Sequence, residues 1–231
     1  MFLSDYMRQP EKDREFLEYV HGRSGSAGER ATSIVKNAVL LRFSKTEIGH
    51  LALGTTLVAA VGMSFVGWHF RPDFLLVFTS AFILHELAHK FLAQFYRAWA
   101  EFRVIMYGAV ITAISAIPFF PFKFIAPGAV FIGGPISERK NGRISLVGPL
   151  TNVGLCTGFM LAYMAEPSQI FFIGARFNAW IALFNLIPFM GLDGSKIFSW
   201  NKMVWIATMA ASVSLYITSS LITGRSLLGF F

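Results

Sequence analysis

The sequence is poor in charged residues and in cysteine. Asp, Glu, Lys and Arg make up 14% of the 231 residues, whereas about a quarter is usual for soluble globular domains. At the same time 55% of the residues are hydrophobic, which excludes a disordered chain. The single cysteine, Cys156, lies in an apolar run, so the chain has no disulfide framework.

The net charge of +7 does not mark a basic face that would bind nucleic acid. Eight of the 20 Lys and Arg residues lie in residues 1–47, where seven acidic residues nearly balance them. The other twelve are scattered near the ends of apolar runs, a distribution typical of membrane proteins. We therefore expect the chain to sit in a lipid bilayer and to have no nucleic-acid partner.

Five apolar stretches are long enough to cross the hydrocarbon layer as helices, which takes roughly 20 residues. A sixth region, Val104–Ile132, is broken by prolines and glycines, and its part Phe124–Ile132 is expected to be extended or re-entrant. The predicted fold is an all-α polytopic membrane protein with five or six transmembrane helices and a small re-entrant β element. The five stretches are Ile48–Phe70, Phe74–Trp99, Ile144–Ala165, Ile170–Met190 and Met203–Ile222.

The first 47 residues differ in composition from the rest. They contain a charged stretch, a Gly/Ser linker and a short segment whose apolar residues share one helical face. No apolar core follows Met1, so we do not expect a signal peptide. The sequence predicts a cytosolic N-terminal arm with an interfacial helix over residues 1–47 and a membrane-embedded domain over residues 48–231.

The distribution of Lys and Arg between the apolar stretches predicts the orientation. With residues 1–47 in the cytosol, the inner side holds most of the basic residues and the outer side only Arg71 and Arg225. This bias favours a cytosolic N-terminus in a multi-pass protein of the cell membrane. Since Arg97 and Arg139 must then both face inward, Val104–Ile132 must enter and leave on the same side.

Three ionisable residues lie within five positions of the second apolar stretch. His85, Glu86 and His89 form an H-E-x-x-H pattern, in which residues four apart share one face of a helix. The two imidazoles can therefore bind one metal ion, while Glu86 points away from them and can act as a base. Because an unpartnered Glu is costly within a membrane, chance occurrence of this pattern is disfavoured.

A hydrolytic zinc site needs a third protein ligand. Only two acidic residues follow residue 140, and of these Glu166 is expected in an outer loop. Asp193 lies at the inner end of the Ile170–Met190 stretch, where Pro188, Gly191 and Gly194 interrupt the helix. The alternative for Asp193 is an ion pair with Lys196 in an interfacial turn.

Three motifs in order resemble the site-2 protease family of intramembrane zinc metalloproteases: His85–His89, Gly148–Asn152 and N-x-x-P-x-x-x-L-D-G at Asn185–Gly194. The resemblance covers residues 48–205. It implies that His85, His89 and Asp193 bind Zn²⁺, that Glu86 is the catalytic base and that Asn185 steadies the substrate carbonyl. It also implies that the helix carrying Asn152 packs between the two metal-bearing helices.

The expected substrates are transmembrane segments of other proteins, cut near the cytosolic face. An unwound substrate segment is expected to add as a strand to the Pro/Gly-rich region around Val130 and Phe131, and Asn152 is a further candidate for substrate binding. The alternatives are a metal transporter or inactive relative, and a membrane metallopeptidase with a glutamate as third ligand. The last is disfavoured because no E-x-x-x-D follows residue 89.

Two further predictions concern isolated polar residues. His50 lies close to Glu47 in the sequence and is a candidate for a regulatory pair with it. Arg176, within the Ile170–Met190 stretch, is expected to extend outward to the membrane surface. The sequence leaves the oligomeric state open.

Overall fold

The computed structural model describes residues 42–65, 67–68, 71–118, 120, 123–189 and 191–223. All of them belong to one compact unit, Leu41–Phe231. The predicted arm and interfacial helix fall on residues 1–47, of which 1–41 lie outside the described residues, so this part of the domain division stays a prediction.

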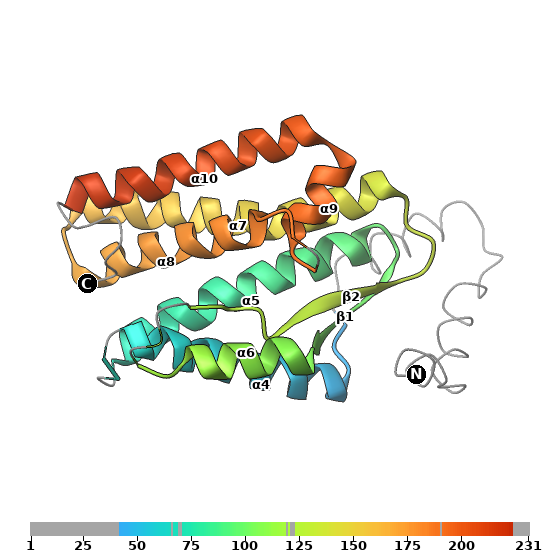
Figure 1. Cartoon of the computed structure of the whole chain (residues 1–231), viewed down its shortest axis with the longest axis horizontal. Helices are drawn as coiled ribbons and strands as arrows, with labels where there is room; N and C mark the ends of the chain where they lie inside the picture. Colours follow the sequence, from blue (N-terminus) through green and yellow to red (C-terminus); the bar gives the residue numbers. More distant parts are fainter. Residues whose placement is uncertain are drawn as a thin grey trace, which may run out of the picture. The chain divides into compact units, whose positions relative to one another are not determined.

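Long helices run side by side through the described part of the chain (Figure 1). Four of them, among the described residues, are long and apolar enough to cross a membrane, as judged by length and composition: α4 (Lys45–Phe65), α5 (Pro72–Phe95), α7 (Glu138–Ala165) and α10 (Lys202–Thr223). A membrane protein is therefore indicated.

Helix α8 (Gln169–Leu186) is the fifth predicted span. It is 18 residues long and does not meet the same criterion, because Arg176, Asn178 and Asn185 lower its hydropathy. Most of α8 is instead buried between α7 and α10. The predicted number of five or six crossings is therefore not confirmed.

A small antiparallel sheet lies at one end of the helices (Figure 1). Strands β1 (Trp99–Val104) and β2 (Gly128–Gly133) pair so that Phe102 lies opposite Val130. Between them the chain forms the short helix α6 (Met106–Ser115) and returns, with the Ile105 N–H donating to the Pro127 carbonyl at 3.0 Å. This confirms the predicted β element and the extended segment within Phe124–Ile132.

Strand β1 was not predicted as a strand. The apolar stretch was expected to remain helical up to Trp99, but α5 ends at Phe95 and Arg97 adopts a left-handed backbone (φ 61°). The chain can then turn sharply into β1, in which Ala100 and Phe102 are buried on alternate positions. Pairing with a strand almost 30 residues away, which sequence periodicity does not reveal, stabilises this conformation.

The apolar core lies around α5, which packs against α4, α7 and α8. The side chains of Phe74, Phe78 and Phe82 are nearly fully buried, and the Phe78 and Phe177 rings lie 4.6 Å apart between centroids. The prediction that Arg176 extends to the membrane surface is wrong. Its side chain is fully buried, donates to the Ser220 and Tyr216 hydroxyls of α10, and thereby ties α8 to α10.

Close contact between α4 and α5 depends on Gly62. A Cβ atom there would lie 2.1 Å from the Phe78 ring, whereas one at Gly49, on the same helix, would meet nothing within 4 Å. We expect Gly62→Ala to destabilise the protein by about 1–3 kcal/mol through overpacking. Gly49→Ala is the matched control, since the same gain in helix propensity then comes without a clash. Thermal unfolding in detergent measures both, and equal melting temperatures would contradict this packing.

Candidate metal centre

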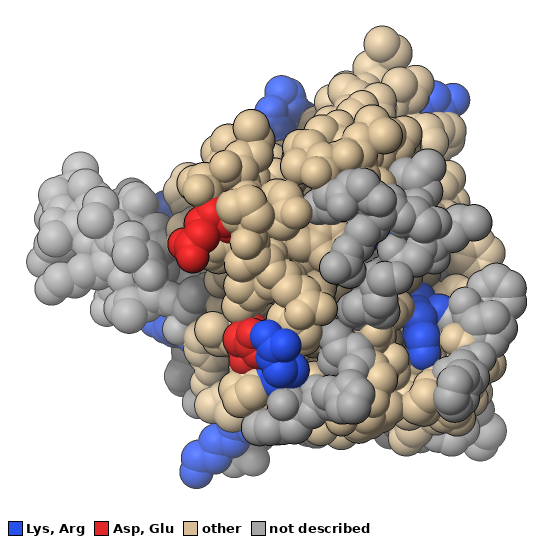
Figure 2. Space-filling model, turned by 90° about the vertical axis from the view of Figure 1, so that its left-hand side faces the viewer, with Lys and Arg blue, Asp and Glu red and all other residues tan. Residues whose placement is uncertain are grey.

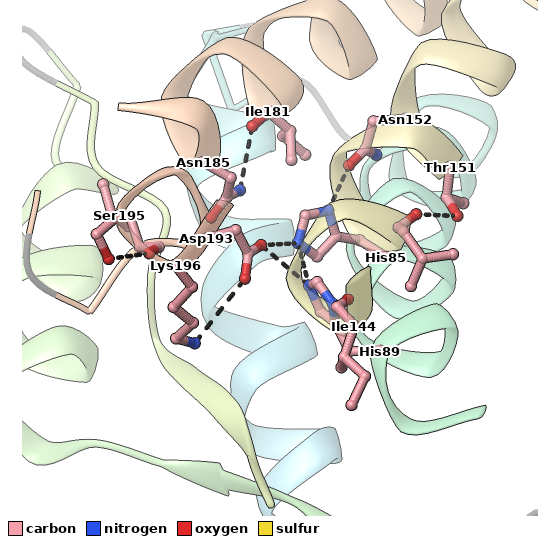
Figure 3. Close-up of polar contacts among 12 residues, drawn as sticks. His85, His89, Ile144, Thr151, Asn152, Ile181, Asn185, Asp193, Ser195 and Lys196 are labelled. Carbon is pink, nitrogen blue, oxygen red and sulfur yellow. Dashed lines mark hydrogen bonds and ion pairs between the residues drawn. The ribbon is translucent and has the colours of Figure 1, made fainter. Parts of the chain in front are cut away.

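Three ligand atoms from α5 and from the start of α9 (Asp193–Trp200) converge in the interior (Figure 3). His85 and His89 lie one helical turn apart, with their Nε2 atoms separated by 3.0 Å. Oδ2 of Asp193 lies 3.2 Å from His85 Nε2 and 3.0 Å from His89 Nε2. All three residues are buried, so the structure brings together the predicted ligand set.

Hydrogen bonds to the opposite ring nitrogens fix both imidazoles. His89 Nδ1 lies 2.6 Å from the Ile144 carbonyl oxygen, which can only accept, so Nδ1 carries the proton. His85 Nδ1 lies 2.6 Å from Asn152 Oδ1. The Asn152 amide nitrogen donates to the Ala81 carbonyl at 3.0 Å and to Asn178 Oδ1 at 2.9 Å, which leaves Oδ1 as an acceptor for His85. In the neutral rings both Nε2 lone pairs therefore point into the centre.

This arrangement fits a metal ion. Two imidazole lone pairs and a carboxylate oxygen would repel one another at 3.0–3.2 Å without a cation between them. Ligand atoms of tetrahedral zinc, with bonds of ~2.0–2.1 Å, lie about 3.3 Å apart. Nitrogen and carboxylate donors are also the ligand types that zinc takes in hydrolytic sites.

The Asp193 carboxylate directs one oxygen, Oδ2, toward the two histidines. The other carboxylate oxygen, Oδ1, lies 4.0 Å from Lys196 Nζ. The ion pair considered as an alternative role for Asp193 therefore coexists with its place in the metal centre.

A tight turn after α8 brings Asp193 back toward α5. Gly191 has a left-handed backbone (φ 90°), which glycine adopts without strain. At Gly194 the backbone passes so close to the end of α8 that a Cβ would lie 2.1 Å from the Leu186 carbonyl oxygen. These two glycines explain how a residue 108 positions after His85 can reach it.

Helix α7 packs over the candidate metal centre at Gly148, where no side chain separates its backbone from the histidines. A Cβ at this position would lie 2.3 Å from His89 Nε2 and 2.7 Å from His85 Nε2. Pro149, the next residue, lies inside α7 and cannot donate a hydrogen bond to the preceding turn. The absence of a side chain at Gly148 therefore lets α7 approach the ligand atoms closely enough for Ile144 and Asn152 to orient the imidazoles.

A cavity of about 160 Å³ opens beside the ligand atoms. Glu86 and Asn185 line it, and Glu86 Oε2 is buried without a hydrogen-bond partner among the described residues. Val130 lines the cavity too, whereas Phe131 is 44% exposed and does not. Asn152 is fully buried behind His85, and its contacts are those of a residue that positions the imidazole. Substrate contacts of Asn152, Val130 and Phe131 stay predictions.

The chain is 36% identical over 180 residues to a protein of Methanocaldococcus jannaschii that bears the name "Putative zinc metalloprotease MJ0611". The matched region is 72% of this chain and 90% of that protein. The chain belongs to this zinc metalloprotease family. No protein-family model and no solved structure matches it.

Family membership and the ligand geometry together support zinc as the cofactor of this metalloprotease. The residues that sequence reasoning missed are those that orient the ligands. Asn178 on α8 supports Asn152, and its only signal in the sequence is an amide side chain within an apolar run. The role of the Ile144 carbonyl could not be predicted from the sequence, because every residue has a backbone carbonyl.

We expect Gly148→Ala to displace both imidazoles and to lower zinc affinity, by about 10- to 100-fold as for the loss of a ligand-orienting contact. Gly154→Ala, on the same helix but with nothing within 4 Å of its Cβ, is the matched control. Zinc per chain, determined by elemental analysis after dialysis against a weak chelator, measures the effect. Equal zinc retention in the two variants would show that α7 does not pack over the ligands as described.

Proposed function

We propose that this metalloprotease is an intramembrane endopeptidase of the site-2 protease family, which hydrolyses peptide bonds in transmembrane segments of other proteins near the cytosolic face. The observation that carries the proposal is the position of the ligands. His85 and His89 lie within α5, a helix long and apolar enough to cross a membrane, and both are buried inside the protein. Such a position favours a substrate that itself lies in the membrane.

Charge supports a position near the cytosolic face. His89 precedes the end of α5 by six residues, about 9 Å along a helix. The same end of the helices, where α7 and α10 begin, carries Arg97, Arg139, Lys140, Arg143 and Lys202 (Figure 1). The opposite end faces the viewer in Figure 2, where uncharged residues make up most of the described surface and the basic side chains are scattered. In our proposal the basic end is cytosolic, as the positive-inside rule requires.

In our proposal Glu86 moves the proton. A zinc ion held by His85, His89 and Asp193 would polarise the scissile carbonyl and make water a better nucleophile. Glu86 Oε2, buried in the cavity and without a partner among the described residues, accepts the proton of the attacking water and returns it to the leaving amine.

Asn185 is the candidate for holding the substrate carbonyl. Its amide nitrogen donates to the Ile181 carbonyl at 3.1 Å, which uses one of the two amide hydrogens. Asn185 lines the same cavity as Glu86, so the second hydrogen is available to a substrate oxygen there. Such a donor stabilises negative charge that develops on this oxygen.

Strand β2 offers an edge to an unwound substrate. The register makes Arg103 and Ala129 a hydrogen-bonded pair, so the N–H and C=O groups of Gly128 and Val130 point away from β1. Gly128, Val130 and Ile132 line the cavity. The backbone carbonyls of a helical substrate accept hydrogen bonds within the helix, so the substrate must unwind before it is cut. Pairing with the β2 edge would replace the hydrogen bonds that are lost on unwinding.

We expect Glu86→Gln to keep zinc and to lower cleavage of a transmembrane substrate by at least ~10²-fold, because the variant lacks the base but keeps all three ligands. Asp193→Ala is the comparison that loses both zinc and cleavage. Zinc content and product formation in reconstituted vesicles are measured in parallel. Unreduced cleavage by Glu86→Gln would refute the hydrolytic proposal, and metal flux through vesicles would favour a transporter.

Val130→Pro should slow cleavage of a transmembrane substrate by removing one edge donor, while zinc content stays unchanged. Val130→Ala is the control, since it keeps the backbone N–H and loses only side-chain contacts. Initial cleavage rates of the two variants test the strand-addition step. If Val130→Pro cleaves as fast as Val130→Ala, the substrate does not pair with β2.

A further inference from the structure

The outer edge of β1 is occupied by side chains of α4. The Phe102 N–H donates to Glu47 Oε1 at 2.9 Å, and the Val104 N–H donates to His50 Nδ1 at 3.1 Å. Glu47 and His50 lie three residues apart and so share one face of α4. Phe102 and Val104 lie two residues apart and so present their N–H groups on one edge of β1. Helix α4 thus takes the place of a third strand.

The same carboxylate reaches the helix that carries the metal ligands. Glu47 Oε2 forms an ion pair with Lys90 Nζ of α5, and the two side chains are 0% and 1% exposed. Lys90 directly follows His89. Glu47 therefore bridges α4, α5 and β1 at a single point, and neither partner can move without leaving a charge unpaired in the interior.

Glu47 and His50 do not form the predicted pair with each other. Each bonds instead to a different N–H of β1, and only Glu47 is fully buried. Their common target is a strand that sequence reasoning did not identify.

The consequence for the sheet is that its two edges differ. The β1 edge has its Phe102 and Val104 donors satisfied, whereas no described residue bonds the N–H groups of Gly128, Val130 and Ile132 on the β2 edge. The β2 edge also lines the cavity of the metal centre.

We propose that Glu47 and His50 are positioning residues that leave β2 as the single edge for a substrate strand and fix its register relative to the metal ligands. This inference rests on the proposed intramembrane proteolysis. Glu47 sets the register through its two oxygens, one on the Phe102 N–H of the sheet and one on Lys90 of α5. His50 holds the next donor along the same edge.

The test compares two double variants without the buried charges. Glu47→Gln with Lys90→Met keeps an amide oxygen for the Phe102 N–H, whereas Glu47→Leu with Lys90→Met removes it. We expect the first to cut a transmembrane substrate at the same bond as the unmutated chain. The second should yield an additional product displaced by ~2 residues, the repeat of a strand. Mass spectrometry of the products measures the cleaved bond.

His50→Gln and His50→Leu form a second pair that leaves the ion pair intact. The glutamine oxygen can accept from the Val104 N–H, whereas leucine cannot, so only His50→Leu should yield displaced products. A purely structural role would lower the amount of folded protein without changing the cleaved bond. A single, unchanged cleavage site in both leucine-containing variants, at the rate of their glutamine counterparts, would overturn the inference.

A measurement that needs no proteolysis separates this inference from the proposed function. Hydrogen–deuterium exchange over residues 99–104 should be faster in each leucine-containing variant than in its glutamine counterpart, since a β1 amide has lost its acceptor. Equal exchange within both pairs would overturn the inference even if the protein cleaves membrane substrates. Faster exchange in a chain that cleaves no transmembrane substrate would support the edge contacts and refute the proteolytic function and the register role.

Discussion

Three hydrogen-bond acceptors that face one another in a buried site place the strongest demand on this structure. Two imidazole nitrogens and a carboxylate oxygen meet at 3.0–3.2 Å, and all three residues are buried. A bound cation makes such a meeting favourable. To bind it, the neutral rings must be held in the tautomer whose Nε2 lone pairs face the centre. The Ile144 carbonyl, the Asn152 and Asn178 amides, and the bare backbone at Gly148 all serve this requirement.

Helix α5 combines two separate tasks on different faces. One face carries His85 and His89 toward α7 and α9, and the other carries Lys90 toward Glu47 of α4. Since β1 bonds to Glu47, the sheet is held against the helix that holds the metal ligands. The rigid spacing of side chains along one helix therefore relates the sheet to the metal centre.

The sequence is sufficient to predict which residues converge at the metal centre, but not which residues support them. H-E-x-x-H has a fixed helical geometry, and an acid close to helix-breaking residues is rare enough in this chain to single out Asp193. The extended segment near Val130 follows from its prolines and glycines. Strand β1, the burial of Arg176 and the contacts of Glu47 and His50 depend on residues distant in the chain. Local patterns carry no information about such partners.

The difference between the two sheet edges also affects whether copies of this protein associate with one another in the bilayer. A short ribbon with open edges is a template for association between identical chains. Here Glu47 and His50 satisfy donors on one edge, and the other edge lines an internal cavity. Edge-to-edge aggregation of neighbouring copies is thereby disfavoured.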